Sequence, residues 1–416
     1  MAMSLAFHIV FAAIGIAMPV LMAIAELWWL RKKDAAALAL AHRWARGTAI
    51  LFAVGSVSGT VLSFELGLLW PAFMAFAGPI FGLPFALEGF AFFLEAIFLG
   101  IYLYGWERVS PWTHWLAGVM VALSGTLSGI FVVTANAWMN TPAGFGLVGG
   151  RAVGVDPIAA MLNPAARSEC VHMTLAAFAA VGFAVAAIHA HLLRQDPRNL
   201  FHRRAVAIAL TVGGAAAVLQ PLSGDFSARH VARAQPVKLA AMEGHFQTQR
   251  DAPLRIGFWE IPYGLSLLAF HDPHAVVTGL DDFPPEDQPP VAPVHVAFQV
   301  MVGCGMAMAA TALLGGWLYL RRRALPDAPG YLRLVTLCGP LGFIAIEAGW
   351  TVTEVGRQPW IVHGVMRTSE SVTPMPHLAV PFSTFSILYL FLAVVVVVLL
   401  RRQVFQSPRL VAPDQA

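Results

Sequence analysis

Nine apolar segments of about 20 residues recur along the chain, and they constrain its fold more than any other feature. A helix of that length crosses about 30 Å of hydrocarbon, where every backbone group must be hydrogen-bonded within the protein. The composition agrees, because 58% of the residues are hydrophobic and 12% are charged, against about 25% charged in soluble domains. We therefore predict an all-α integral membrane protein with nine transmembrane helices. The expected spans lie near residues 4–29, 47–68, 83–104, 113–137, 171–193, 205–224, 295–320, 331–352 and 378–400.

The connections divide the chain into unequal parts. A Gly- and Pro-rich link is expected at residues 69–82 and a loop at 138–170. The predicted parts are residues 1–224 with six spans, a long polar loop at 225–294, residues 295–400 with three spans, and a tail at 401–416.

Basic residues indicate how the chain is oriented in a membrane. If the N-terminus lies outside, roughly two thirds of the 26 Lys and Arg residues fall in inner segments, as the positive-inside rule requires. The loop at 225–294 is then periplasmic and the C-terminus cytoplasmic. The apolar start has no basic region before it, which favours a retained span over a cleaved signal peptide.

Several ionisable side chains lie inside the expected spans, where a charge costs about 2.5–3.5 kcal/mol and therefore suggests a function. The carboxylates are Glu65, Glu88, Glu95 and Glu347, with Glu26 near an inner end, and the imidazoles are His8 and His172.

Four potential iron ligands fall in the outer half of the membrane in this orientation: His8, His172, Met301 and Glu347. A His with a Met gives a six-coordinate low-spin haem, whereas an open position lets a haem bind oxygen. Taken singly, each has a structural alternative. A lone buried His is more often a hydrogen-bonded core residue, and a lone Met is usually core packing.

Two pairs of polar residues suggest further roles. Glu88 and Glu95 are two helical turns apart, so they share one helix face about 10 Å apart, which suits either a proton relay or a pair of structural carboxyls. Lys238 and Glu243, in the long loop, would lie about 140° apart on a helix. They could approach one small polar ligand or simply be solvated.

The chain resembles subunit I of the cytochrome bd-type quinol oxidases over essentially its whole length. The resemblance rests on the segments ALEGFAFFLEAIFLGIYLYGWER, NPAARSECVH, KLAAME and FQVMVGCG, and on EAGW and GRQPW within residues 343–360. These segments occur in the family's order and on the expected side of the membrane. The family has nine helices and a periplasmic quinol loop, in agreement with the spans above.

The resemblance implies a role for each candidate residue. His172 and Met301 would ligate a low-spin haem b, and His8 and Glu347 would serve two high-spin haems, one a haem b and the other a haem d or a third haem b. Glu88 and Glu95 would line the dihaem site or its proton route, and Lys238 and Glu243 would act in quinol oxidation. The surroundings of the cofactors would include Gln299, Arg357 and Trp360.

The activity implied is a terminal respiratory oxidase in the bacterial inner membrane. Ubiquinol or menaquinol would be oxidised at the periplasmic face, and O2 would be reduced to water with cytoplasmic protons, so that a proton-motive force forms without pumping. The resemblance implies a second membrane subunit, subunit II, leaves open a small single-helix subunit, and implies no nucleic-acid partner.

The sequence departs from the family pattern in three places. Only seven residues precede His8, where relatives carry a longer lead, which suggests a truncated start; Gln299 stands where better-known members have Arg, and Phe343 where they often have Trp. The quinol loop at 225–294 is also short for this family. In this loop length and in Gln299 the chain resembles the cyanide-insensitive branch of the family.

Two other functions would also account for some of these residues. A proton-coupled transporter would use Glu65, Glu88 and Glu95 as a relay and would be colourless. A dihaem cytochrome b would favour paired histidines 13 or 14 residues apart, which the intramembrane histidines do not show.

Overall fold

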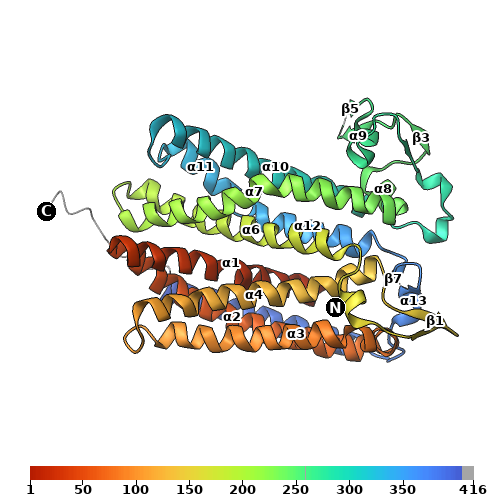
Figure 1. The fold of residues 1–416 in the computed structure, drawn as a ribbon, viewed down its shortest axis with the longest axis horizontal. Helices are drawn as coiled ribbons and strands as arrows, with labels where there is room; N and C mark the ends of the chain where they lie inside the picture. The colour runs from red at the N-terminus through yellow and green to blue at the C-terminus, as the bar shows by residue number, and fades with distance from the viewer. Residues whose placement is uncertain (258, 405–416) are drawn as a thin grey trace.

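The computed structural model describes residues 1–257 and 259–404, in which long helices run side by side along one axis (Figure 1). Within these residues nine helical segments are long and apolar enough to cross a membrane, which confirms the predicted number. The segments are α1 (Ala2–Lys32), α2 (Ala35–Leu69), α3 (Pro71–Tyr104), α4 (Pro111–Asn140), α6 (Ala166–Gln195), α7 (Leu200–Ala234), α10 (Val291–Arg322), α11 with α12 (Pro329–Cys338 and Leu341–Val355) and α14 (Ala379–Gln403).

One end of the bundle, the short-turn end, carries tight connections between helices. The Asp34 carboxylate accepts hydrogen bonds from the first backbone N–H groups of α2, and the Asn199 side chain does the same for α7. The Arg43 guanidinium donates to the Val404 carbonyl at 2.8 Å, which places the end of α14 here as well.

The opposite end, the loop end, carries the short elements and the N-terminus (Figure 1). The short helices are α5 (Pro157–Met161), α8 (Pro236–Glu243), α9 (Gly264–Phe270), α13 (Thr368–Ser371), η1 (Leu280–Asp282) and η2 (Pro285–Asp287). Among the described residues, four antiparallel two-stranded pairs lie at this end as well: β1 (Gly146–Val148) with β2 (Arg151–Val153), β3 (Gln249–Arg250) with β6 (Val276–Val277), β4 (Leu254–Ile256) with β5 (Trp259–Ile261), and β7 (Trp360–Val362) with β8 (Met366–Arg367).

The expected link at residues 69–82 is wrong, because α3 begins at Pro71 and continues through it. Proline is tolerated in the first helical turn, where its missing N–H would have no partner. Further along, Phe73 and Phe81 pack in a buried cluster with Trp138 of α4. Burial of these aromatic rings outweighs the weak helix propensity of the Gly and Pro residues between them.

Other boundaries also differ from the prediction. The eighth span is broken between α11 and α12 at Gly339 and Pro340, because proline cannot donate the backbone hydrogen bond that a continuous helix needs. Helix α7 runs ten residues beyond its predicted end, to Ala234. Of the predicted tail, residues 405–416 lie outside the described part of the chain.

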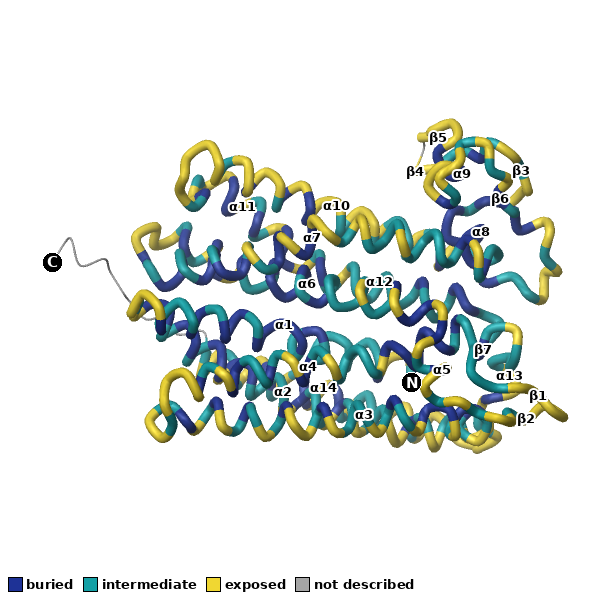
Figure 2. The backbone as a smooth tube through the Cα atoms, viewed as in Figure 1, coloured by how far each residue is buried: buried dark blue, intermediate teal, exposed yellow. Residues whose placement is uncertain are grey.

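Close contacts hold together the helices that carry the candidate residues. Gly182 of α6 and Gly213 of α7 let the two backbones approach where any side chain would collide. A buried cluster joins Ala13 of α1, Ala177 of α6 and, at its edge, Ile346 of α12. Exposed residues recur along the outer sides of the helices (Figure 2). Many of the exposed residues are large and apolar, as expected of a surface that meets lipid.

Candidate functional site

The two candidate histidines each hydrogen-bond a serine on the neighbouring helix. His8 Nδ1 lies 2.9 Å from Ser58 Oγ, and Ser58 Oγ donates to the Gly55 carbonyl at 3.0 Å. His172 Nδ1 lies 3.0 Å from Ser223 Oγ, which donates to the Gln220 carbonyl at 2.9 Å. Since each serine hydrogen is used on a carbonyl, each imidazole must donate from Nδ1 to the serine oxygen.

This pattern fixes the tautomer of both rings, so that Nε2 carries an unprotonated lone pair. The amide nitrogen of Gln220 is nearly equidistant from Nδ1 and Nε2 of His172, at 3.3 and 3.2 Å. An atom so placed must lie over the face of the ring, because in the ring plane it would collide with ring carbons. The in-plane lone pair of Nε2 is therefore not used by Gln220, and each histidine has the form that ligates a metal.

Met301 and Glu347 lie on the facing helices α10 and α12. A Cβ added at Gly349 would be 2.8 Å from Met301 Sδ, so the sulfur reaches the backbone of α12 only because residue 349 is glycine. Glu347 Oε1 is buried and has no hydrogen-bond partner among the described residues. A buried carboxylate oxygen without a partner is costly, and a metal cation would satisfy it.

These donors fit haem better than a bare metal ion. The described residues contain no group of three or more His, Cys, Asp or Glu side chains that could hold an ion. A haem supplies four nitrogen ligands itself and needs one or two from the protein. Separate single donors, each pre-oriented, are what such a cofactor requires.

Glu88 and Glu95 both face α4, which confirms that they share one face of their helix. Ser128 Oγ donates to Glu88 Oε1 at 3.2 Å, and a Cβ added at Gly125 would be 3.1 Å from Glu95 Oε1. Glu95 also lies against Gly15 of α1 and is 5% exposed. The pair therefore forms a ladder of carboxyls between α3 and α4.

The remaining intramembrane carboxylates have partners elsewhere. Glu65 accepts a hydrogen bond from Ser4 Oγ at 2.7 Å and lies 3.3 Å from the amino group of Met1. Glu26, near the short-turn end, is 2.7 Å from His114 Nδ1. Both oxygens of Glu65 and one oxygen of Glu26 thus lie near a local partner.

Lys238 and Glu243 lie on α8, the helix that packs against the ends of α7 and α10, and both are buried. Burial lowers the pKa of the Lys238 ammonium to about 8, an effect that Glu169 and Glu354 oppose and Arg357 adds to. Burial also raises the pKa of the Glu243 carboxyl to about 7. A cation and a carboxyl group that both titrate near neutral pH suit proton-coupled chemistry.

A buried polar network surrounds Lys238, and sequence reasoning missed most of it. Its centre is Asn140, whose side chain contacts Lys238, Glu169 and Arg357. The signal was partly visible, because Glu354 follows Glu347 by two helical turns and Glu169 lies in the segment that ends at His172.

The other predicted cofactor residues are less closely grouped. Arg357 is buried, and its guanidinium donates to Glu354 Oε2 at 2.5 Å. Trp360 begins β7 and lies under the guanidinium of Arg367, 4.7 Å from the ring centre. The Gln299 amide points toward the loop and donates to the Arg255 carbonyl at 3.3 Å.

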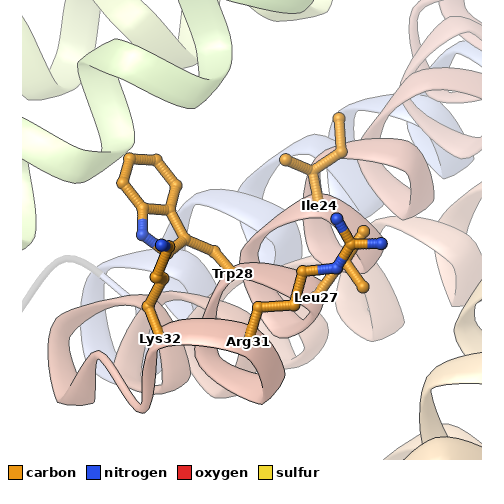
Figure 3. Close-up of a pocket in the computed structure, with 5 residues that line it drawn as sticks. All are labelled: Ile24, Leu27, Trp28, Arg31 and Lys32. Carbon is orange, nitrogen blue, oxygen red and sulfur yellow. The ribbon is translucent and has the colours of Figure 1, made fainter.

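A surface pocket of about 280 Å³ lies away from all of these residues. It is lined by Ile24, Leu27, Trp28, Arg31 and Lys32 of α1 (Figure 3). Its position near the end of α1 places it at the short-turn end, so it contains none of the predicted site residues.

Comparison with known proteins decides the family. The profile described as "Cytochrome bd terminal oxidase subunit I" matches residues 1–408. The chain therefore belongs to the cytochrome bd oxidase subunit I family. Among curated relatives of this subunit I, the "Putative cytochrome bd menaquinol oxidase subunit I" of Bacillus subtilis is 36% identical over 95% of the chain and 93% of the relative. The "Cytochrome bd ubiquinol oxidase subunit 1" of the same organism is 33% identical over 96% and 90%.

A solved structure agrees with the fold of this subunit I. The bd oxidase of Geobacillus thermodenitrificans matches it with a TM-score of 0.91 and 40% identity, covering 98% of this chain and 97% of that one. Membership makes the protein a subunit of a terminal respiratory quinol oxidase of the bacterial inner membrane, with haem cofactors and a quinol substrate. The predicted enzyme class is thus confirmed, and the transporter alternative is wrong.

Proposed function

We propose that this subunit holds its haem iron through His172 with Met301 at a low-spin haem b and through His8 and Glu347 at two high-spin haems. The observation that carries this assignment is the serine to which each histidine donates from Nδ1, because it leaves both Nε2 lone pairs available. The third haem is a haem d or a haem b. Both macrocycles accept the same ligands.

Bound haem iron supplies the one-electron chemistry by which quinol loses two electrons and O2 gains four with four protons to give two waters. The protein residues determine access, orientation and protonation. Glu88 and Glu95 offer a two-step carboxyl ladder between α3 and α4 for protons that reach the oxygen-reducing side. Gln299, Arg357 and Trp360 complete the proposed surroundings of the cofactors.

Quinol oxidation is assigned to α8. The Lys238 ammonium stabilises the negative charge that develops on a quinol oxygen as its O–H bond breaks, and the Glu243 carboxylate accepts the proton. Both side chains are buried, so the electrostatic effect of each is stronger than it would be in water. With the N-terminus outside, these protons leave on the periplasmic side.

The oxidase is proposed to act as a complex with subunit II. Family membership implies that second subunit, and the exposed apolar faces of the helices offer it a surface. The segment between α7 and α10 is proposed as the periplasmic quinol-oxidising part; it covers 235–290 rather than the predicted 225–294, because α7 ends at Ala234 and α10 begins at Val291.

The replacement Met301→Leu tests the central assignment, because it removes the sulfur while conserving side-chain volume. We expect the reduced-minus-oxidised spectrum of the purified complex to lose its low-spin haem signal, with the fold retained. A low-spin signal of full amplitude would refute Met301 as the ligand. A pyridine haemochrome assay on the same samples gives the haem types and their stoichiometry.

A further inference from the structure

Lys238 belongs to a network of two buried cations and two partly buried carboxylates at the loop end. The network joins α4, α6, α8 and the end of α12, and its other charged members are Glu169, Glu354 and Arg357. Because two positive and two negative charges balance, the network can be buried at a moderate cost in free energy.

The Asn140 side chain connects the two signs of charge. Its Oδ1 lies 3.5 Å from Lys238 Nζ and 3.4 Å from Arg357 Nη1, while its Nδ2 donates to Glu169 Oε1 at 2.9 Å. A rotated amide would turn its NH2 group toward two cations and its oxygen toward a carboxylate. The surrounding charges therefore fix the orientation of Asn140, which in turn offers the lysine an acceptor in one direction.

The lysine stem is held as closely as its ammonium. A Cβ added at Gly356, the glycine of the GRQPW segment, would be 3.2 Å from Lys238 Cε. The ammonium donates to the Thr353 carbonyl at 3.3 Å and to Asn140, which uses two of its three N–H donors among the described residues. The third donor remains for a ligand.

We propose that Asn140 and Glu169 are positioning residues of the quinol site: Asn140 orients the Lys238 ammonium, and Glu169 keeps it charged. The proposal rests on the role of Lys238 in quinol oxidation put forward above. Neither residue is expected to contact the iron or the quinol.

The charges that face Lys238 determine the direction in which its pKa should change when one of them is removed. They are Glu169 on α6, Glu354 on α12 and Arg357 after α12. The titratable His363, between β7 and β8, also faces Lys238, and burial lowers its pKa. Burial lowers the pKa of Lys238 to about 8, and the charge of Glu169 counteracts this effect. Since lysine is charged below its pKa, loss of the Glu169 charge must discharge Lys238 at a lower pH.

The replacement Glu169→Gln tests this expectation in the assembled oxidase, with a soluble quinol as the probe. We expect the alkaline limb of the kcat/KM profile to move down by about one pH unit, the lower bound for loss of a near opposite charge. Adding Asn140→Asp to Glu169→Gln returns one carboxylate beside Lys238 without setting two carboxylates 2.9 Å apart, so the alkaline limb of the double variant should move back up. A residue that only stabilises the fold would not produce shifts of opposite sign.

Glu260→Gln is the matched control. It removes a carboxylate charge at the same end, from an exposed ion pair with Arg255, and should leave the pH profile unchanged. Glu169→Asp should keep most of the wild-type profile, because it retains the charge. If Glu169→Gln alone fails to assemble, the double variant decides, because an alkaline limb that stays about one pH unit low despite the returned carboxylate would contradict the role of the charge.

Two outcomes separate the possible failures. A wild-type pH profile for Glu169→Gln, with haem content intact, would overturn the positioning role. Full quinol oxidation by Lys238→Met would instead overturn the proposed function of Lys238 itself.

Discussion

Gly349→Ala perturbs the proposed low-spin haem without touching either ligand. The added Cβ would lie 2.8 Å from Met301 Sδ, whereas van der Waals contact requires about 3.5–4.0 Å. The overlap of about 1 Å falls in the range where overpacking costs about 1–3 kcal/mol. Met301 has a flexible side chain, so the sulfur is expected to move rather than the α12 backbone.

The expected result is conversion of the low-spin haem to a high-spin form, read from the reduced-minus-oxidised spectrum with the haem stoichiometry unchanged. Gly303→Ala is the control, because it lies two residues from Met301 on α10 and its added Cβ meets nothing within 4 Å. An unaltered low-spin signal in Gly349→Ala, together with its loss in Met301→Leu, would refute the packing argument alone. An unaltered signal in both would refute the ligand.

Two further perturbations test the second ligand and the quinol site. Ser223→Ala removes the 3.0 Å hydrogen bond at His172 Nδ1, which is worth about 0.5–1.5 kcal/mol. Haem affinity should therefore fall about two- to tenfold, as measured by the transfer of haem to an apoprotein acceptor. An unchanged transfer rate would contradict the tautomer argument. The profile of kcat/KM against pH should rise through about 7 as Glu243 deprotonates and fall through about 8 as Lys238 loses its proton. Glu243→Gln should lower activity and abolish the acid limb while sparing haem content; a persistent limb, or loss of all haem, would exclude Glu243 as the base.

Transmembrane spans could be predicted because hydrocarbon requires long apolar runs, and such runs are visible in any short window of the sequence. Their boundaries could not, since the helices extend past the apolar window into polar residues, as α7 does to Ala234. The prediction of a link at 69–82 was wrong for a different reason. The helical state of this segment depends on burial of Phe73 and Phe81 beside Trp138, which lies nearly sixty residues further along the chain.

The residues of the candidate site likewise include some that could be predicted from the sequence and some that could not. Side chains with chemistry of their own, such as His8 and His172, could be recognised from residue type and depth in the membrane. Their serine partners could not, because Ser58 is 50 residues from His8 and Ser223 is 51 residues from His172. Asn140 was missed because an amide at a helix end gives no signal until Lys238 and Glu169 converge on it.

Glycine connects these observations, because several side chains proposed to act in the reaction face a glycine on another helix or segment. Long or planar side chains need room between helices, and the absence of a Cβ on the opposing backbone provides it without separating the helices. The EAGW and GRQPW segments thereby gain a physical meaning: their glycines serve a methionine and a lysine on other helices. The facing pairs are His8 with Gly59, Glu95 with Gly125, His172 with Gly224, Lys238 with Gly356 and Met301 with Gly349. Enlarging such a glycine alone should displace the opposing side chain where the added Cβ comes too close, as at Gly349 with 2.8 Å to Met301 Sδ, but not at Gly224, where the added Cβ would lie 3.5 Å from His172.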